Sequence, residues 1–281
     1  MTSLSATLKG WLAAGRPAVL VEVAEARGST PREVGARMLV GLESTLGTIG
    51  GGRLEWEAIE AAHRLLGEGA SDATLELPLG PALGQCCGGH VRLRLEHATA
   101  STLVRLEEGE RAEAARNPTV LLFGAGHVGK ALAQALSPLP LTVQWIDARA
   151  EEFPDPLPPG ITRIIAVRPV DLVATAPAGA GYLVLTHEHA LDFAIASAVL
   201  DRGDFAYAGL IGSTTKRRRF ERLYGARGRD IRQLARLNCP IGGGRVADKR
   251  PAVIAALTAA ELLVAFAGYA AQADAAGQRY G

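Results

Sequence analysis

A glycine-rich turn between an apolar run and an amphipathic run most narrowly restricts how this chain can fold. In VLLFGAGHVGKALAQAL, residues 120–136, the apolar run is followed by Gly124, Gly126 and Gly129. In dinucleotide-binding folds these three glycines allow a tight turn, a close approach of the backbone to phosphate, and close packing of helix on strand. Asp147 ends the next apolar run, where a carboxylate meets ribose hydroxyls in such folds. The spacing predicts a Rossmann-like unit, whose glycine turn either holds a phosphate or nucleotide or has lost or changed its ligand.

The C-terminal half alternates apolar strands with helices, which is typical of a parallel sheet covered on both faces. The expected strands are TVLLF, LTVQWID, TRIIAV, GYLVLT and DFAYAGLIG. Helices are expected over 188–200, 214–223 and 251–266, and the last is so apolar that it must be buried. The predicted fold class is α/β, with a C-terminal Rossmann-like parallel sheet domain and a smaller N-terminal α+β domain.

The N-terminal part shows a different pattern. We expect a helix over 3–14 and strands over 18–26, 36–40, 74–77 and 91–96. In VRLRLE the side chains alternate with period two, so Arg92 and Arg94 are expected on one face. The charged stretch EEGERAEAARNP lacks apolar periodicity and ends in a proline before a strand. We therefore predict an N-terminal domain over 1–106, a linker over 107–118 and the Rossmann-like domain over 119–281.

The composition limits the functions open to the chain. Lys and Arg (30) nearly balance Asp and Glu (29), so no overall field attracts nucleic acid or a membrane surface. Lys9 and Arg16 interrupt the N-terminal apolar run, and no run of about 18 uncharged apolar residues occurs, so neither a signal peptide nor a membrane span is expected. Three cysteines make no disulfide framework, which favours a reducing compartment. We expect a cytoplasmic protein without nucleic-acid or membrane partners.

Two more loops are expected at the carboxyl ends of the parallel strands, where ligands of doubly wound sheets bind. The loop THEHALD is expected to bring His187 and His189 to the cleft beside His127 of the glycine turn. It resembles the HxHxDH site of metallo-hydrolases, but Leu191 stands where the aspartate would be, which disfavours a zinc site. The alternative for each histidine is a hydrogen-bonded residue at the start of a helix.

The stretch GLIGSTTKRRRF is expected at the same edge of the sheet. Ser213 can cap a helix whose first turns carry Lys216 and three arginines. Cations near a helix N-terminus oppose the helix dipole, so helix stability does not explain them. They form either an anion site, in which Ser213 and Lys216 hold a phosphate, or a solvated basic face.

Adjacent cysteines in LGQCCGGH pose a separate question. A disulfide between Cys86 and Cys87 would close a strained ring, and together with the distant Cys239 the pair offers too few ligands for an evident zinc site. The pair is either a soft metal ligand or sulfur carrier, with Gln85 as a hydrogen-bonding neighbour, or inert packing. The nearby loops RGSTPREVGARML and GTIGGGRLE are candidate anion-binding nests.

Eight motifs occur in a fixed order: GSTPREVGARMLV, GTIGGGRLE, LGQCCGG, FGAGHVGKALA, DAR, LTHEHALD, GLIGSTTKRRRF and CPIGG. Together they resemble the XdhC/CoxI family of xanthine dehydrogenase accessory proteins over nearly the whole chain. The resemblance implies binding of molybdenum cofactor, support of its sulfuration by a cysteine desulfurase, and its transfer to apo xanthine dehydrogenase. Some CoxI-like relatives carry a cysteine after the triple glycine, where this chain has Arg53.

The resemblance and the motifs together assign an expected role to each candidate residue. Cys86 or Cys87 would contact molybdenum or its sulfur, with Gln85 beside them. The terminal phosphate of the cofactor would lie against Gly124, Gly126, Gly129, Ser213 and Lys216. The cleft would be lined by His127, Asp147, His187 and His189. The apolar terminal helix favours a homodimer.

Two enzymatic functions stand as alternatives to this chaperone. The first is an NAD(P)-dependent oxidoreductase using the Rossmann-like domain, in which Asp147 would favour NAD. The second is a nucleotidyltransferase or other metal-dependent enzyme acting on the pterin phosphate, which would require a divalent metal. Neither alternative accounts for the paired cysteines, so an accessory protein without turnover is the leading expectation.

Overall fold

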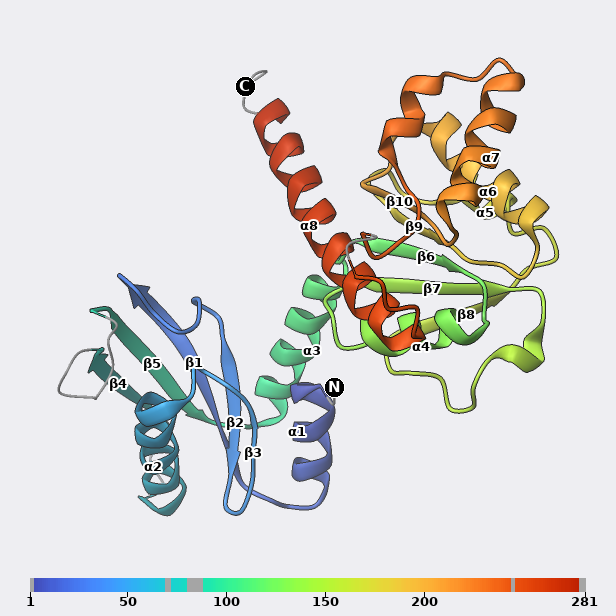
Figure 1. Ribbon diagram of the computed structural model, residues 1–281. Coiled ribbons are helices and arrows are strands. Elements are labelled where there is room, and N and C mark those ends of the chain that lie inside the picture. Colours follow the sequence, from blue (N-terminus) through green and yellow to red (C-terminus); the bar gives the residue numbers. More distant parts are fainter. Residues whose placement is uncertain (1–2, 69–71, 80–87, 244–245, 278–281) are drawn as a thin grey trace. The chain divides into compact units, whose positions relative to one another are not determined.

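The computed structural model describes residues 3–68, 72–79, 88–243 and 246–277 (Figure 1). The chain forms two compact units, Met1–Glu113 and Ala114–Gly281. Their boundary lies inside the segment 107–118, but most of that segment is not an irregular linker, because helix α3 (Ala100–Ala114) continues through it. Only the first half of α3 packs on the sheet, and its later turns are charged and mostly exposed. Apolar periodicity therefore could not reveal the end of this helix.

Unit 1 contains a five-stranded antiparallel sheet in the order β3-β2-β1-β5-β4. Its strands are β1 (Ala18–Arg27), β2 (Arg37–Gly41), β3 (Thr45–Gly47), β4 (Asp72–Pro78) and β5 (His90–His97), and its other helices are α1 (Leu4–Ala13) and α2 (Gly52–Glu68). Period-two alternation along β1 directs Val19 and Val21 to the face that α2 covers. Leu20 faces the opposite side, where it packs with residues of α1 and α3.

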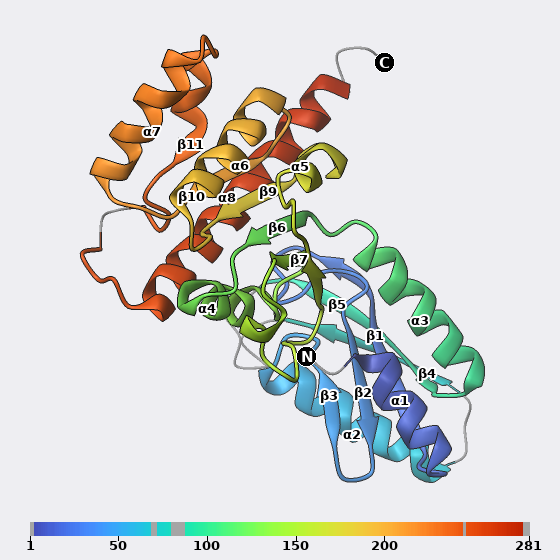
Figure 2. The ribbon, with the colours of Figure 1, turned by 90° about the vertical axis from the view of Figure 1, so that its right-hand side faces the viewer.

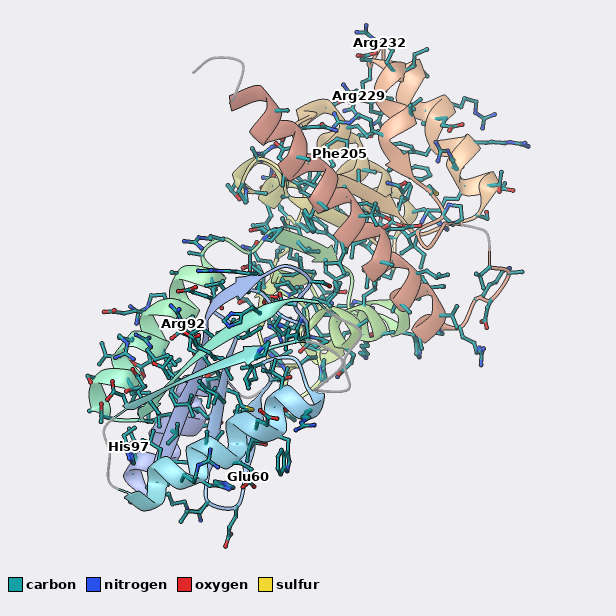
Figure 3. All side chains as sticks on the ribbon, turned by 90° about the vertical axis from the view of Figure 1, so that its left-hand side faces the viewer. Glu60, Arg92, His97, Phe205, Arg229 and Arg232 are labelled. Atoms are coloured by element: carbon teal, nitrogen blue, oxygen red, sulfur yellow. The ribbon has the colours of Figure 1, made fainter. Side chains whose placement is uncertain are left out.

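Arg92 and Arg94 share one face of β5, as the period-two pattern predicts. Arg92, which is labelled in Figure 3, forms ion pairs with Glu25 of β1 and, at 2.9 Å, with Glu76 of β4. Arg94 pairs with Glu22 of β1 at 3.0 Å. These half-exposed pairs neutralise the two arginines within the sheet, so unit 1 offers no free basic stripe along β5.

Unit 2 contains a six-stranded sheet in the order β11-β10-β9-β6-β7-β8, in which every neighbouring pair is parallel. Its strands are β6 (Thr119–Phe123), β7 (Thr142–Asp147), β8 (Ile161–Ile165), β9 (Gly181–Val184), β10 (Tyr207–Leu210) and β11 (Leu237–Asn238). Its helices are α4 (His127–Leu136), η2 (Ala150–Glu152), α5 (Asp171–Thr175), α6 (His189–Arg202), α7 (Thr214–Ala226), η3 (Ile231–Arg236) and α8 (Pro251–Gly277). The predicted α/β fold class, with its antiparallel N-terminal and parallel C-terminal sheets, is confirmed.

Helices cover both faces of the parallel sheet (Figure 2). Val120 and Leu122 of β6 point into the core under α4 and α8, whereas Leu121 and Phe123 point into the core under α5, α6 and α7. From β6 the chain first moves outward to β7 and β8, and then returns to β9 on the other side of β6. The carboxyl ends of β6 and β9 therefore flank the point where strand order reverses, which is where doubly wound sheets bind ligands.

Helix α8 is longer and less buried than the sequence predicts. It continues eleven residues past Phe266 to Gly277. Leu262 and Phe266 are buried on the sheet, but Leu263 and Val264 are 40% and 74% exposed. Within the described residues, Pro251–Ala273 is a single stretch long and apolar enough to cross a membrane by length and composition, a test that core helices also pass. The expectation that the chain has no membrane partner stays a prediction.

Candidate functional site

The glycine turn after β6 leaves open space in front of α4. Gly124 has a φ of +116°, and a Cβ there would overlap the carbonyl oxygen of Leu185. A Cβ on Gly129 would overlap the carbonyl oxygen of Gly124. A Cβ on Gly126, by contrast, would have no heavy atom within 4 Å. Gly124 and Gly129 therefore serve the packing of the turn, and Gly126 leaves the N-terminal amides of α4 accessible to a ligand.

A cavity of about 390 Å³ lies at the carboxyl ends of the parallel strands. It is lined by Gly126 and His127 at the start of α4, by Arg149 after β7, and by Thr186 and His187 after β9. The structure thus brings together three of the predicted binding residues, Gly126, His127 and His187. The other lining residues are mostly apolar, except for the guanidinium of Arg149 and the carboxylate of Glu152, which set the charge of the cavity.

Asp147 does not face the cavity as a free carboxylate. It is 6% exposed, and its oxygens accept hydrogen bonds from the Ala125 amide at 2.7 Å and from the Arg149 amide at 3.0 Å. The Arg149 side chain donates two more, from Nε at 3.0 Å and from Nη2 at 2.9 Å. Burial alone would raise the pKa of Asp147, but these hydrogen bonds outweigh it and lower the pKa to about 2. The predicted ribose-binding carboxylate instead positions a guanidinium.

Arg149 also connects to a second carboxylate at the rim of the cavity. Its Nη1 donates to Glu152 at 3.2 Å, and the Nζ of Lys130 lies 3.2 Å from the other oxygen of Glu152. Asp147 and Glu152 occupy three of the N–H donors of Arg149. A guanidinium has five such donors, so two remain for a ligand.

Ser213 and Lys216 do not line this cavity. Ser213 caps α7 by accepting a hydrogen bond from the Lys216 amide at 3.2 Å. The Nζ of Lys216 lies 2.6 Å from Asp192, whose side chain is 1% exposed. Asp192 also accepts from the amide and the hydroxyl of Thr186, each at 2.8 Å. The charge of Lys216 is therefore committed to a buried carboxylate that holds the loop after β9 in place.

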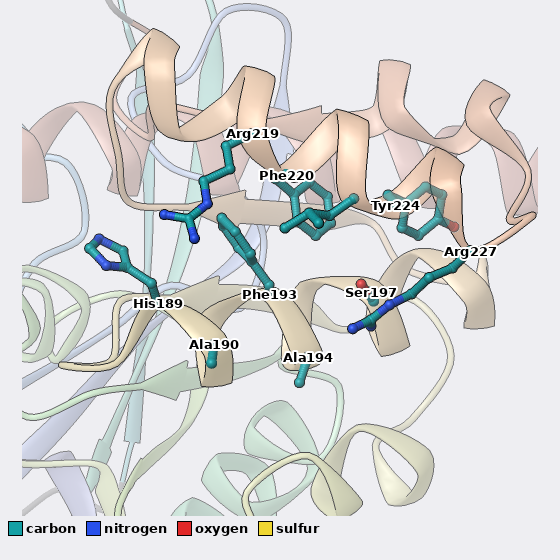
Figure 4. A pocket seen from close by; sticks show the side chains of 10 residues that line it. His189, Ala190, Phe193, Ala194, Ser197, Arg219, Phe220, Tyr224 and Arg227 are labelled. Carbon is teal, nitrogen blue, oxygen red and sulfur yellow. The ribbon is translucent and has the colours of Figure 1, made fainter.

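His189 lies in a different cavity from His187. As the first residue of α6, it lines a groove between α6 and α7 (Figure 4). The two histidines therefore line separate cavities, whereas the sequence predicts that they line one cleft. Among the described residues, no group of three or more His, Cys, Asp or Glu side chains could hold a metal ion.

The predicted nests of unit 1 have internal partners. Gly51 and Ile49 donate their amides to Glu55 of α2 at 2.9 and 3.3 Å, and the Thr48 hydroxyl donates to the same oxygen at 2.7 Å. The turn GTIGGGRLE therefore binds the carboxylate of its own chain. In the other nest, Arg32 pairs with Glu33 at 3.1 Å.

Three glycine loops of unit 1 lie at one end of its sheet. A Cβ on Gly28 would lie 3.2 Å from the Cα of Gly89, and a Cβ on Gly50 would lie 2.5 Å from Pro31. The predicted ligands Gln85, Cys86 and Cys87 lie outside the described residues, immediately before Gly88. The third cysteine, Cys239 in unit 2, is 6% exposed, and burial raises its pKa, which disfavours a reactive thiolate.

Sequence reasoning missed Arg149, Glu152 and Asp192 as members of these networks. The motif DAR carried a usable signal, because an arginine two residues after a strand-end aspartate can fold back onto it. For Asp192, which follows Leu191 in THEHALD, the sequence gives no sign of an ion pair. Its actual partner, Lys216, is 24 residues away, and only the packing of α6 and α7 brings the two together.

Fold and site together define a protein with a Rossmann-type ligand-binding unit, whose cavity combines helix N-terminal amides with a guanidinium, and an antiparallel α+β unit in the same chain. The profile of the XdhC Rossmann domain matches residues 120–262, and that of the XdhC and CoxI family matches residues 11–77. The chain belongs to the XdhC/CoxI family, which confirms the resemblance seen in its motifs.

Two known proteins illustrate this relationship. YqeB of Escherichia coli K12, described as uncharacterized, is 29% identical over 263 residues, which cover 88% of this chain and 43% of YqeB. The chain thus spans less than half the length of that relative. A crystal structure from Bacillus halodurans, described as a xanthine dehydrogenase, matches with a TM-score of 0.73 and 19% identity over 95% of this chain and 96% of that one. At this identity the likeness shows the fold alone.

Proposed function

We propose that the protein binds molybdenum cofactor as cargo and delivers it to apo xanthine dehydrogenase, without turnover of its own. Membership of the XdhC/CoxI family supports an accessory role, since the family name associates these proteins with xanthine dehydrogenase. The observation that carries the finer proposal is the cavity after β6, where open helix amides and a guanidinium occur together. Both groups attract a phosphate such as the terminal phosphate of the cofactor.

The residues around the cavity suit an anionic group. Gly126 allows close approach to the backbone, because no heavy atom lies near its Cβ position. Arg149 is 30% exposed and is held in one orientation by Asp147, so little side-chain entropy is lost when it binds a ligand. Asp147 and Glu152 offset much of the local positive charge. This balance favours a bound group that can later be released.

We further propose that Cys86 or Cys87 contacts molybdenum or carries sulfur from a cysteine desulfurase, with Gln85 beside them. The support comes from the described flank of this loop. Gly89 is buried, and a Cβ on it would overlap the carbonyl oxygens of Arg27 and Ser29. Gly89, two residues after Cys87, therefore packs closely on another glycine-containing loop of unit 1.

The direct test is anaerobic incubation with molybdenum cofactor, followed by gel filtration and analysis of bound molybdenum and pterin. The parent should retain both. Arg149→Leu should lose most of the pterin, and Cys86→Ala or Cys87→Ala should lose molybdenum or its labile sulfur. Loaded parent protein should then restore xanthine oxidation to the apoenzyme. Full retention by all three variants would contradict the proposed roles, and failure of the parent to retain cofactor would contradict the function.

A second candidate is an NADP-dependent oxidoreductase, which the retained glycine turn favours. The ion pair between Asp147 and Arg149 changes the expected preference between NAD and NADP. A guanidinium faces the cavity where NAD-binding proteins present a carboxylate to ribose. This candidate therefore predicts NADP rather than NAD. Binding of NADP together with hydride transfer to an added acceptor, in a protein that retains no molybdenum, would support it.

The cytoplasmic location and the homodimer stay proposals. For the homodimer, the support is the exposed apolar surface of α8 around Leu263 and Val264. Sedimentation velocity of the parent and of Val264→Glu would test it, because a dimer formed through this face should dissociate in the variant.

A further inference from the structure

A groove between α6 and α7 is separate from the cavity after β6. It has a volume of about 220 Å³ and shares no lining residue with that cavity. Figure 4 shows Phe193 of α6 and Phe220 of α7 in its middle, with Arg219 toward one end and Arg227 toward the other. The groove thus has an apolar centre between two cationic ends.

The apolar centre is built from packed aromatic rings. The ring centroids of Phe193 and Phe220 lie 5.2 Å apart, and those of Phe220 and Tyr224 lie 5.7 Å apart. Leu223, at the edge of the groove, is 40% exposed. Ligand pockets usually have volumes of roughly 300–1,000 Å³, so this groove suits one or two apolar side chains better than a whole cofactor.

The cationic side chains of α7 and of Arg227, directly after it, divide into paired and unpaired groups. Lys216 and Arg217 at its start are paired with Asp192 and Glu221. Four exposed arginines have no ion pair or side-chain hydrogen bond within the described part of the chain, namely Arg218, Arg219, Arg222 and Arg227. Their charge is therefore available to a partner of opposite sign.

The spacing of the groove residues defines the shape of that partner. Arg219 and Leu223 are four residues apart on one face of α7, and Arg227, which directly follows the helix, lines the same groove four residues later. Eight residues correspond to about 12 Å along a helix. A matching helix would carry an acidic residue, an apolar residue four positions later and a second acidic residue four positions after that.

We propose that this groove docks an acidic amphipathic helix of apo xanthine dehydrogenase, with an apolar side chain against Phe193 and Leu223 and carboxylates on Arg219 and Arg227. The inference rests on the proposed function, because it assigns the surface through which the cargo-bearing protein meets its recipient. Nucleic acid fits less well, since its affinity comes mainly from many phosphate contacts and needs no apolar centre.

The test measures the affinity of the full chain for purified apo xanthine dehydrogenase by calorimetry at low and high salt. The variant Arg219→Glu/Arg227→Glu reverses the two groove charges. Arg218→Glu/Arg222→Glu is the matched control, with the same change of charge on arginines that do not line the groove. Ala194→Trp fills the groove without changing the charge. Circular dichroism melting and cofactor retention by each variant verify that unit 2 is intact.

We expect the groove reversal and Ala194→Trp each to weaken binding at least about tenfold, as for hot-spot residues, and the control pair to weaken it less than about threefold. Equal losses in both charge-reversed variants would indicate a diffuse field and overturn the inference. Unchanged binding of every variant would overturn it and leave the proposed function standing. Absence of binding by the parent would overturn both. The inference would also fail if the parent bound duplex DNA and only the groove-reversed variant lost this binding, because these arginines would then serve nucleic acid.

Discussion

Arg149 holds both carboxylate oxygens of Asp147, with Nε 3.0 Å from Oδ1 and Nη2 2.9 Å from Oδ2. The aspartate is nearly inaccessible, whereas the guanidinium keeps one side on the cavity. The cavity is therefore lined by the guanidinium, and the strand-end carboxylate is buried beneath it. Under the proposed function, the same two residues would affect both the stability of unit 2 and the binding of its ligand.

The first prediction concerns the pH dependence of stability. The pKa of Asp147 falls from an ordinary 3.8 to about 2 in the folded protein, which corresponds to about 2 kcal/mol of stability. Because the folded pKa is the lower one, this contribution is present above about pH 4 and is lost as the pH falls toward 2. Asp147→Asn should be less stable than the parent at pH 7 by about this amount. Urea unfolding of both proteins between pH 7 and 2 should show the difference shrinking, and a constant difference would contradict the assignment.

Arg149→Leu should weaken the binding of a phosphorylated ligand in unit 2 by at least about tenfold, because a charge-assisted hydrogen bond contributes roughly 1.5–3 kcal/mol. Arg168→Leu is the matched control, since Arg168 is 80% exposed and does not line the cavity. Equilibrium dialysis with molybdenum cofactor, NADP and NAD measures the effect. Equal losses of affinity for NADP and NAD would argue against recognition by Arg149 of the phosphate that NADP has and NAD lacks.

Substitution by alanine should have different effects on stability at two glycines of the turn. Gly129→Ala should destabilise unit 2 by about 1–3 kcal/mol or more, because the new methyl group meets the carbonyl of Gly124. Gly126→Ala should leave the melting temperature nearly unchanged, because its Cβ position is empty and its φ of −70° suits alanine. The same variant should nevertheless weaken ligand binding, since the methyl group stands where a phosphate would approach. Thermal melting and dialysis of both variants distinguish the two roles.

Lys216→Met should destabilise unit 2 by about 3–5 kcal/mol, because it leaves the buried carboxylate of Asp192 without its cation. The double variant Asp192→Asn/Lys216→Met should recover part of this loss, since no buried charge remains. Arg218→Met, at an exposed and unpaired position nearby, should change stability by less than about 0.5 kcal/mol. A Lys216→Met variant that melts like the parent and only loses ligand would restore the phosphate role that the sequence suggests.

Glu55→Ala should destabilise unit 1 by about 1–3 kcal/mol, because the hydroxyl of Thr48 and the amides of Ile49 and Gly51 lose their acceptor. Glu55→Gln keeps an acceptor oxygen and should lose less. Added phosphate should raise the melting temperature of Glu55→Ala more than that of the parent, because the vacated turn resembles an anion nest. The absence of any phosphate effect on the alanine variant would show that this turn does not bind free anions.

Local patterns predicted the architecture because they reflect local physics. The three glycines predicted the position of the Rossmann turn, because the backbone geometry of such a turn requires glycine there. The period-two alternation of side chains predicted the shared face of Arg92 and Arg94. Alternation of strands and helices likewise predicted the parallel sheet. The end of α8 was missed because the alanine-rich turns beyond Phe266 lose the periodic pattern of a buried face.

The composition of the site was less predictable, because it depends on contacts between elements. His187 and His189 differ by two positions, but helix α6 begins between them and turns the second away from the cavity. The partner of Lys216 comes from another helix. Nothing in the local sequence distinguishes a lysine that binds phosphate from one that neutralises a buried aspartate.

The loop after β9 places His187 in the cavity and His189 in the groove, with only Glu188 between them. The cavity and the groove are therefore lined by residues only two positions apart in the chain. If a ligand in the cavity moves residues 187–189 and so changes the affinity of the groove for a partner, reciprocity applies. The partner must then change the affinity of the cavity for the ligand by the same factor. Under the proposed function, cofactor loading and docking of the recipient would then be coupled within unit 2.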